Sequence, residues 1–279
     1  MESPTAVGAD TGLYLYCFFA GPPAVAPEQG IEGTHPTFVL SYRDLCALVS
    51  HVPLQEYNEP TLHRRLEDLP WLTARVKRHE EIVRAVMGLH PVMPVKFGTI
   101  YLSAARVLQA LQSHYQACRA FLTLIRDKEE WGIKVYASGG PEQTLPGASE
   151  LTRELDRRLA TATPGEAYFL RKKRDSLLRQ HVLQRRADLS HQLYQQALSW
   201  CREGRRNPVL SQRATSQAGE MILNAAFLVV QPEVERFKHQ LDDLAAHYEG
   251  DGLSFALSGP WPPYNFCPDL ASVTGENNG

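Results

Sequence analysis

The chain has 279 residues, of which 43% are hydrophobic and 22% are charged, the balance of an ordinary globular protein. Its formal net charge of −2 provides no overall attraction to nucleic acid or to an anionic membrane, so we expect neither as a partner. No apolar run reaches the length of about 18 residues that a membrane span needs. The length exceeds what one core usually holds, and we therefore predict two domains.

The cysteines are odd in number, widely scattered and without a CxxC pair. This pattern argues against a disulfide framework or a structural zinc site. It predicts reduced thiols in a cytosolic protein. The five positions are Cys17, Cys46, Cys118, Cys201 and Cys267.

The first half of the chain opens with short apolar runs that are bounded by turn residues. Residues 13–19 predict a buried strand, and residues 37–40 and 45–49 predict a hairpin. A helix with one buried face follows, because five positions recur at steps of three or four. These positions are Leu72, Val76, His79, Val83 and Val86.

The next elements are a short strand and a helix. Residues 91–97 predict a strand at a sheet edge or a bulge, because Pro94 has no N–H to donate to a ladder. Ser103 is a suitable N-cap for a helix that we expect to end before Gly132.

The second half has the pattern of a split βαβ unit close to the ferredoxin-like motif, with one strand too few. After Ser258, Gly259 and three prolines are expected to end sheet pairing. In chain order we predict a strand at 131–136, a short helix near 151–159, a long helix from 165 to about 206, a strand at 221–230, a helix at 234–248 and a strand at 253–258.

These elements indicate an α+β fold with four segments. We predict a flexible leader over 1–12, an N-terminal α+β domain over 13–130, a C-terminal ferredoxin-like domain with long helices over 131–258, and a tail rich in proline and aromatic residues over 259–279.

No sequence motif for catalysis or cofactor binding is present. Phosphate-binding loops of the GxGxxG or GxxxxGK type and a GxSxG elbow are missing, although a Ser/His/Asp triad assembled through space stays open. His79 and Glu80 resemble the start of a zinc-protease helix, but position 83 is Val and not a second histidine. We therefore expect His79 to be a core histidine, and we expect no catalytic residue, cofactor or metal.

The long predicted helix is strongly basic. Residues 165–206 contain ten Lys and Arg against four Asp and Glu, a local net charge of +6. Such a stripe can bind RNA phosphates or an acidic protein face, or it can be a solvated face that neutralises the acidic remainder. No aromatic stacking motif of an RNA-binding module accompanies it. Its densest part is Arg171, Lys172, Lys173 and Arg174.

The tail carries three aromatic rings, Trp261, Tyr264 and Phe266, on a proline-stiffened backbone. One interpretation is that the rings face a partner, because aromatic residues are enriched at the centres of interfaces. The other is that the tail folds back and buries them within the chain. Composition favours neither interpretation.

Seven segments in order resemble the gas vesicle proteins of the GvpF/GvpL family, and together they span nearly the whole chain. Each segment is weak by itself, whereas the ordered set with its proline-aromatic ending is quite specific. A proline- and glycine-rich loop after Phe19 departs from the pattern. The segments are residues 13–18, 78–80, 91–99, 131–136, 170–174, 222–229 and 259–266.

The resemblance implies a minor, non-catalytic gas vesicle protein with an N-terminal domain of unusual fold and a modified ferredoxin-like C-terminal domain. It implies that the C-terminal domain binds the major shell protein at the gas-facing side of the wall and helps shell assembly to begin. Other accessory gas vesicle proteins are the further partners expected, and the protein is expected in the cytoplasm as well. From composition, the candidate partner-binding residues are the three tail rings and the basic run of residues 171–174. The alternative hypothesis is an RNA-binding module that uses the basic helix.

Overall fold

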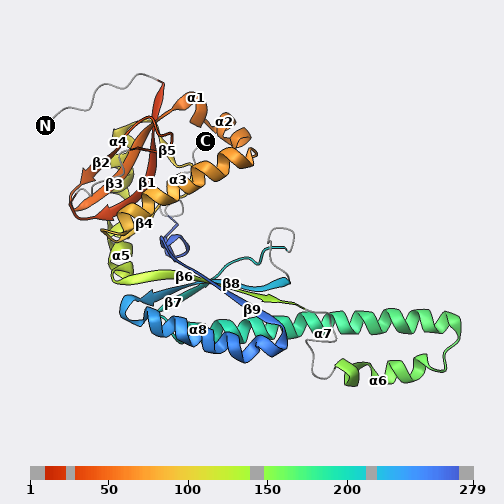
Figure 1. The fold of residues 1–279 in the computed structure, drawn as a ribbon. Helices are drawn as coiled ribbons and strands as arrows, with labels where there is room; N and C mark the ends of the chain where they lie inside the picture. The colour runs from red at the N-terminus through yellow and green to blue at the C-terminus, as the bar shows by residue number, and fades with distance from the viewer. Residues whose placement is uncertain (1–9, 23–28, 139–147, 212–218, 270–279) are drawn as a thin grey trace. The chain divides into compact units, whose positions relative to one another are not determined.

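The computed structural model describes residues 10–22, 29–138, 148–211 and 219–269 (Figure 1). Most of the predicted leader and the end of the predicted tail lie outside these described residues. The fold mixes helices and strands, and the chain forms two compact units. Unit 1 contains residues 1–129 and 261–279, and unit 2 contains residues 130–260.

Unit 1 is built on a sheet with the strand order β2-β3-β1-β4, in which β5 also pairs with β1. The predicted hairpin is confirmed as β2 and β3, which pair antiparallel with Tyr42 opposite Leu45. Pro94 lies in the edge strand β4, as its missing donor predicts. The strands are β1 (Thr11–Ala20), β2 (Thr37–Tyr42), β3 (Leu45–Pro53), β4 (Val92–Pro94) and β5 (Ile100–Tyr101).

The central strand β1 is buried along nearly its whole length. A register shift between Leu15 and Cys17 marks a β-bulge. As a result, Tyr14, Tyr16 and Cys17 all belong to the one hydrophobic cluster that packs against helix α3. The bulge therefore brings two tyrosines and the residue after them to the same face of the sheet.

The described part of unit 1 also contains five helices, three of which are capped by a side chain at the N-terminus. Asn58 and Asp68 cap the second and third helices through their side chains, and Ser103 caps the fourth as predicted. The helices are α1 (Leu54–Tyr57), α2 (Glu59–Arg65), α3 (Leu69–Met87), α4 (Ala104–Ser113) and α5 (Tyr115–Ile125).

Two details of these helices differ from the sequence prediction. Val76, predicted on the buried face of α3, is 42% exposed, and Ile82 is buried instead. The single helix predicted after Ser103 is two helices, because the chain leaves helical geometry at His114 (φ −102°, ψ 11°). Periodicity continues across such a break, and the sequence pattern alone did not reveal it.

Unit 2 has a four-stranded sheet with the order β7-β8-β6-β9. Figure 1 shows α8 and the C-terminal part of α7 along this sheet, while the N-terminal part of α7 extends past it beside α6. The elements are β6 (Lys128–Ala137), α6 (Ala148–Leu159), α7 (Pro164–Leu198), β7 (Glu203–Arg206), β8 (Glu220–Val230), α8 (Val234–Tyr248) and β9 (Leu253–Trp261).

Strand β7 corrects the prediction of a helix that continues to Arg206. Helix α7 ends at Leu198, and residues 203–206 pair antiparallel with β8. Gly204 lies opposite Phe227, where a β-carbon would come within 3.0 Å of the Tyr194 hydroxyl and 3.1 Å of the Phe227 ring. A side chain at this position would require these neighbouring side chains to shift by a few tenths of an ångström, so glycine suits the close approach.

Strand β9 corrects a second prediction. Sheet pairing does not stop at Gly259, because β9 runs through Pro260 to Trp261. The strand lies at the edge of the sheet. There a proline's missing N–H can face away from the ladder, so that proline shapes an edge strand without ending it.

The core of unit 2 joins α7 and α8 to the central strands. Phe237 of α8 is fully buried, and its ring lies 6.2 Å from that of Phe227 and 6.3 Å from that of Trp200. Leu193 and Ala197 of α7 belong to the same cluster. In the described residues, no helix is both long and apolar enough to span a membrane.

Replacing Phe237 by Ala should lower the free energy of unfolding by about 3–5 kcal/mol, the usual cost of emptying a buried aromatic site. Guanidinium denaturation followed by circular dichroism measures this loss. As a control, Leu183→Ala removes a side chain on α7 that is 62% exposed and should change stability by no more than about 0.5 kcal/mol. Equal effects of the two substitutions would contradict the core position of Phe237.

Candidate partner-binding surfaces

The aromatic tail packs against unit 1. Phe266 is only 4% exposed, and the Cys267 thiol donates to the Pro94 carbonyl oxygen at 3.5 Å. Tyr264 to Phe266 form a single 3-10 turn. The tail thus returns to the unit in which the chain began.

Tyr264 is held through the buried imidazole of His79. Each ring nitrogen of His79 lies 3.0 Å from a tyrosine oxygen, Nδ1 from Tyr14 and Nε2 from Tyr264. The Tyr14 oxygen also accepts a hydrogen bond from the backbone N–H of Gly98, at 3.0 Å. Tyr14 can therefore donate its own proton to Nδ1, which leaves Nε2–H to donate to Tyr264.

Burial determines the protonation states of His79, Tyr14 and Tyr264. It lowers the pKa of His79 from 6.5 to about 4, because the charged imidazolium loses its hydration. It also raises the pKa of both tyrosines well above their ordinary value, so they stay neutral. The prediction of a core histidine is confirmed: tyrosine oxygens lie beside both ring nitrogens, and a hydrogen bond with the Val95 backbone opposes part of the fall in the pKa of His79.

Trp261 is more open than the other two rings, with 37% of its surface exposed. The Arg84 guanidinium lies 4.6 Å from its ring centroid, a cation–π distance. Arg84 also pairs with Glu80 at 2.8 Å, one turn earlier on α3. Of the three tail rings, Trp261 is thus the one that combines its contact to unit 1 with an accessible face.

The four basic residues of α7 fall into two groups. Arg171, Lys172 and Lys173 are exposed. Arg174 instead forms an ion pair with Asp156 of α6 at 2.8 Å. The first three are therefore open to a partner, whereas Arg174 joins the two helices.

Two aromatic residues that the sequence analysis did not select lie beside these cations. Tyr168 is 63% exposed and Phe169 is 70% exposed, with ring centroids 5.6 Å apart. A shallow hollow of ≈470 Å³ is lined by Phe169, Lys172, Lys173 and two neighbours. We call Tyr168, Phe169, Arg171, Lys172 and Lys173 the α7 surface. In the sequence, Tyr168 and Phe169 lie outside the apolar stripe of the helix and just before the basic run. This pattern could have identified the surface.

In the part of the chain that the structure describes, no group of three or more His, Cys, Asp or Glu residues could hold a metal ion. Of the residues predicted as a partner site, the tail rings belong to unit 1 and the basic residues to unit 2. They are two separate candidates.

Comparison with known families matches residues 12–268 to the family described as gas vesicle synthesis protein GvpL/GvpF. A match over this much of the chain defines the class of protein, an accessory protein of gas vesicles. The chain belongs to the GvpL/GvpF family. This confirms the resemblance found in the sequence and gives no support to the RNA-binding alternative.

Comparisons with individual proteins are consistent with this family. The chain is 29% identical to gas vesicle protein L of Streptomyces sp. (strain CB03234), covering 94% of each chain. It is 25% identical to gas vesicle protein L1 of Halobacterium salinarum, covering 93% of this chain and 91% of that protein. Its fold is similar to the crystal structure of GvpF from Anabaena sp. PCC7120, with a TM-score of 0.64, 18% identity and coverage of 92% and 96%.

The buried imidazole predicts a pH dependence of stability. Above pH 6.5, His79 is neutral in both folded and unfolded chains, and its contribution is fully present. As the pH falls from 6.5 toward 4, the unfolded chain binds the proton first, so the free energy of unfolding should decrease by up to about 3 kcal/mol. Urea denaturation at a series of pH values measures this slope.

Burial also lowers the pKa of His51, so part of the slope comes from that residue. His79→Asn should remove the larger part, whereas His63→Asn, a change at an exposed position of α2, should leave the slope intact. An unchanged slope in His79→Asn would contradict the assignment.

Proposed function

We propose that this protein is a non-enzymatic accessory protein that binds the major gas vesicle shell protein and helps shell assembly to begin. Membership of the GvpL/GvpF family supports the gas vesicle part of this proposal. The role at the gas-facing side of the wall, the shell protein as partner and contacts with other accessory proteins follow from the family resemblance.

The single observation that carries the proposal is the exposed α7 surface. Large aromatic side chains exposed next to one another are unusual on a soluble protein and mark interaction sites. A shell is built from a small, strongly apolar subunit that needs protection before it polymerises. Tyr168 and Phe169 offer apolar contact area, and Lys172 and Lys173 offer charge that keeps the surface hydrated when it is empty.

The tail contributes in a different way. We propose Trp261 as its contact residue, because its ring is partly exposed. Tyr264 and Phe266 would act indirectly by holding Trp261 on α3 through their packing in unit 1. Arg174 likewise would act indirectly, by fixing α6 against α7.

We also propose that residues 13–130 and 131–258 act as two domains, the second of them a modified ferredoxin-like domain. The observed order β6, α6 and α7, β7, β8, α8, β9 supports this. It is the strand–helix–strand–strand–helix–strand order of that motif with a second helix in the first connection. Strand β7 supplies the strand that the sequence pattern lacked.

Shell-protein pull-down tests the α7 surface. The double substitution Tyr168→Ala/Phe169→Ala should reduce capture at least tenfold, because aromatic anchors dominate interface energetics. Lys172→Glu/Lys173→Glu should reduce capture less and make the remainder depend on salt. Trp261→Ala should have the smaller effect of a peripheral contact.

Leu183→Ala is the matched control, since it removes another exposed apolar side chain from α7, about 21 Å along the axis from Phe169. The proposal for this surface would be contradicted if stably folded Tyr168→Ala/Phe169→Ala protein captured as much shell subunit as the Leu183→Ala control.

A further inference from the structure

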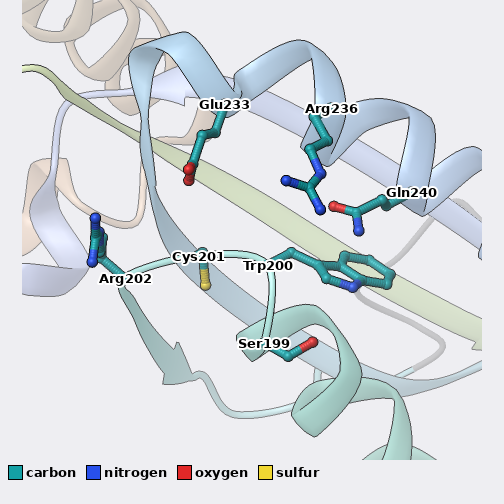
Figure 2. Close-up of a pocket in the computed structure, with 7 residues that line it drawn as sticks. All are labelled: Ser199, Trp200, Cys201, Arg202, Glu233, Arg236 and Gln240. Carbon is teal, nitrogen blue, oxygen red and sulfur yellow. The ribbon is translucent and has the colours of Figure 1, made fainter.

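Unit 2 has a polar cavity of ≈250 Å³ on the side where α7 ends. The turn between α7 and β7 contributes Trp200 and Arg202, and the start of α8 contributes Arg236 and Gln240. Figure 2 shows the Arg236 guanidinium and the Gln240 amide reaching from α8 toward the indole of Trp200. Glu233 points into the space between α8 and the turn.

The base of this cavity packs against the core of unit 2, whereas Arg202, Glu233 and Arg236 at its sides are exposed. Trp200 packs edge-on against Phe237, which is fully buried in the core of unit 2. Phe237 also fixes α8, so that Glu233, Arg236 and Gln240, spaced three and four residues apart, share the helix face next to the turn. The polar groups are thus presented by fixed elements.

The small polar groups of the lining are already used within the fold. The Ser199 hydroxyl donates to the Gln196 carbonyl oxygen at 2.6 Å. The Cys201 sulfur lies 3.5 Å from each of the carbonyl oxygens of Ala197, Leu198 and Glu203, any one of which can accept its single S–H. Burial raises the pKa of Cys201 to about 12, so this thiol is neutral and not a nucleophile.

The guanidinium groups, by contrast, are unused. Across residues 10–22, 29–138, 148–211 and 219–269, neither Arg202 nor Arg236 forms an ion pair, and Glu233 has no cationic partner. Arg174 and Arg186 of the neighbouring α7 do pair with carboxylates. Two cations and one anion give the cavity a net positive charge, which favours an anionic ligand.

The size of the cavity limits the class of ligand that it can hold. Sites for small molecules and cofactors usually have about 300–1,000 Å³. A cavity of ≈250 Å³ is below that range and suits one or two side chains. Guanidinium groups bind planar carboxylates with two parallel hydrogen bonds, and an indole offers a flat apolar face to the methylene groups of the same side chain.

We propose that this cavity binds the carboxylate side chain of an acidic segment on a partner protein, with Arg202 and Arg236 as the anion ligands. Trp200 packs against the methylene groups of that side chain, and Gln240 orients it. Glu233 opposes a second negative charge and so limits the site to a single carboxylate. The site is separate from the α7 surface and does not depend on shell binding there.

The test uses the full chain and two synthetic peptides, acetyl-Gly-Glu-Gly-amide and its Gln counterpart. Titration followed by NMR of the Trp200 indole N–H should show saturable binding of the Glu peptide only. Arg202→Gln and Arg236→Gln should each weaken it roughly tenfold or more, the loss of one charge-assisted interaction. Glu233→Gln should strengthen it severalfold, a result that a merely structural role would not give.

Arg179→Gln is the matched control, because it makes the same change at an exposed position of α7 outside the cavity. Absence of Glu-peptide binding, or equal weakening by Arg179→Gln, would overturn the proposal. Inorganic phosphate that binds as tightly and with the same pattern of variants would overturn the assignment to a protein carboxylate. These outcomes are independent of the pull-down with the shell protein.

Discussion

The length of α7 is the constraint from which the organisation of unit 2 follows. A helix of 35 residues is about 52 Å long, whereas the 11 residues of β8 span about 36 Å. The helix must therefore extend past the sheet that covers its C-terminal part. Leu178 and Val182, which lie N-terminal to the residues of α7 that pack in the main core, form a small cluster of their own.

This constraint gives unit 2 two surfaces with different chemistry. Near the N-terminus of α7, the chain offers the exposed aromatic rings of Tyr168 and Phe169 and the exposed ammonium group of Lys172. Where α7 ends, its last turn meets α8, and the result is a polar cavity with two guanidinium groups. An apolar partner and an acidic partner would thus contact opposite ends of one helix without competing.

Much of the fold could be predicted because its elements have clear periodicity. The hairpin of unit 1, strand β8 and helix α8 follow from burial patterns that depend on each element alone. Strand β7 could not be found in this way, because Glu203 to Arg206 contain no apolar residue and the strand is defined by pairing with β8. The end of β9 was missed because proline was treated as a terminator without regard to its place at a sheet edge.

The candidate surfaces were harder to predict than the fold. The basic run led to α7, but the exposure of Tyr168 and Phe169 depends on the tertiary structure and is not given by their sequence positions. The packing of the tail depends on His79, which is 185 residues away from Tyr264 in sequence and forms a hydrogen bond with it. No local pattern encodes such a contact, so composition could not decide between a buried tail and an open one.

The path of the chain makes unit 2 an insertion within unit 1. Both connections to it, near residues 130 and 260, belong to paired strands, and a β-carbon on Gly259 would lie 2.9 Å from the Glu130 carbonyl oxygen. A chimera between relatives would therefore have to be joined at both places at once. Cutting the chain after β9 would leave unit 2 whole and instead deprive unit 1 of its last segment.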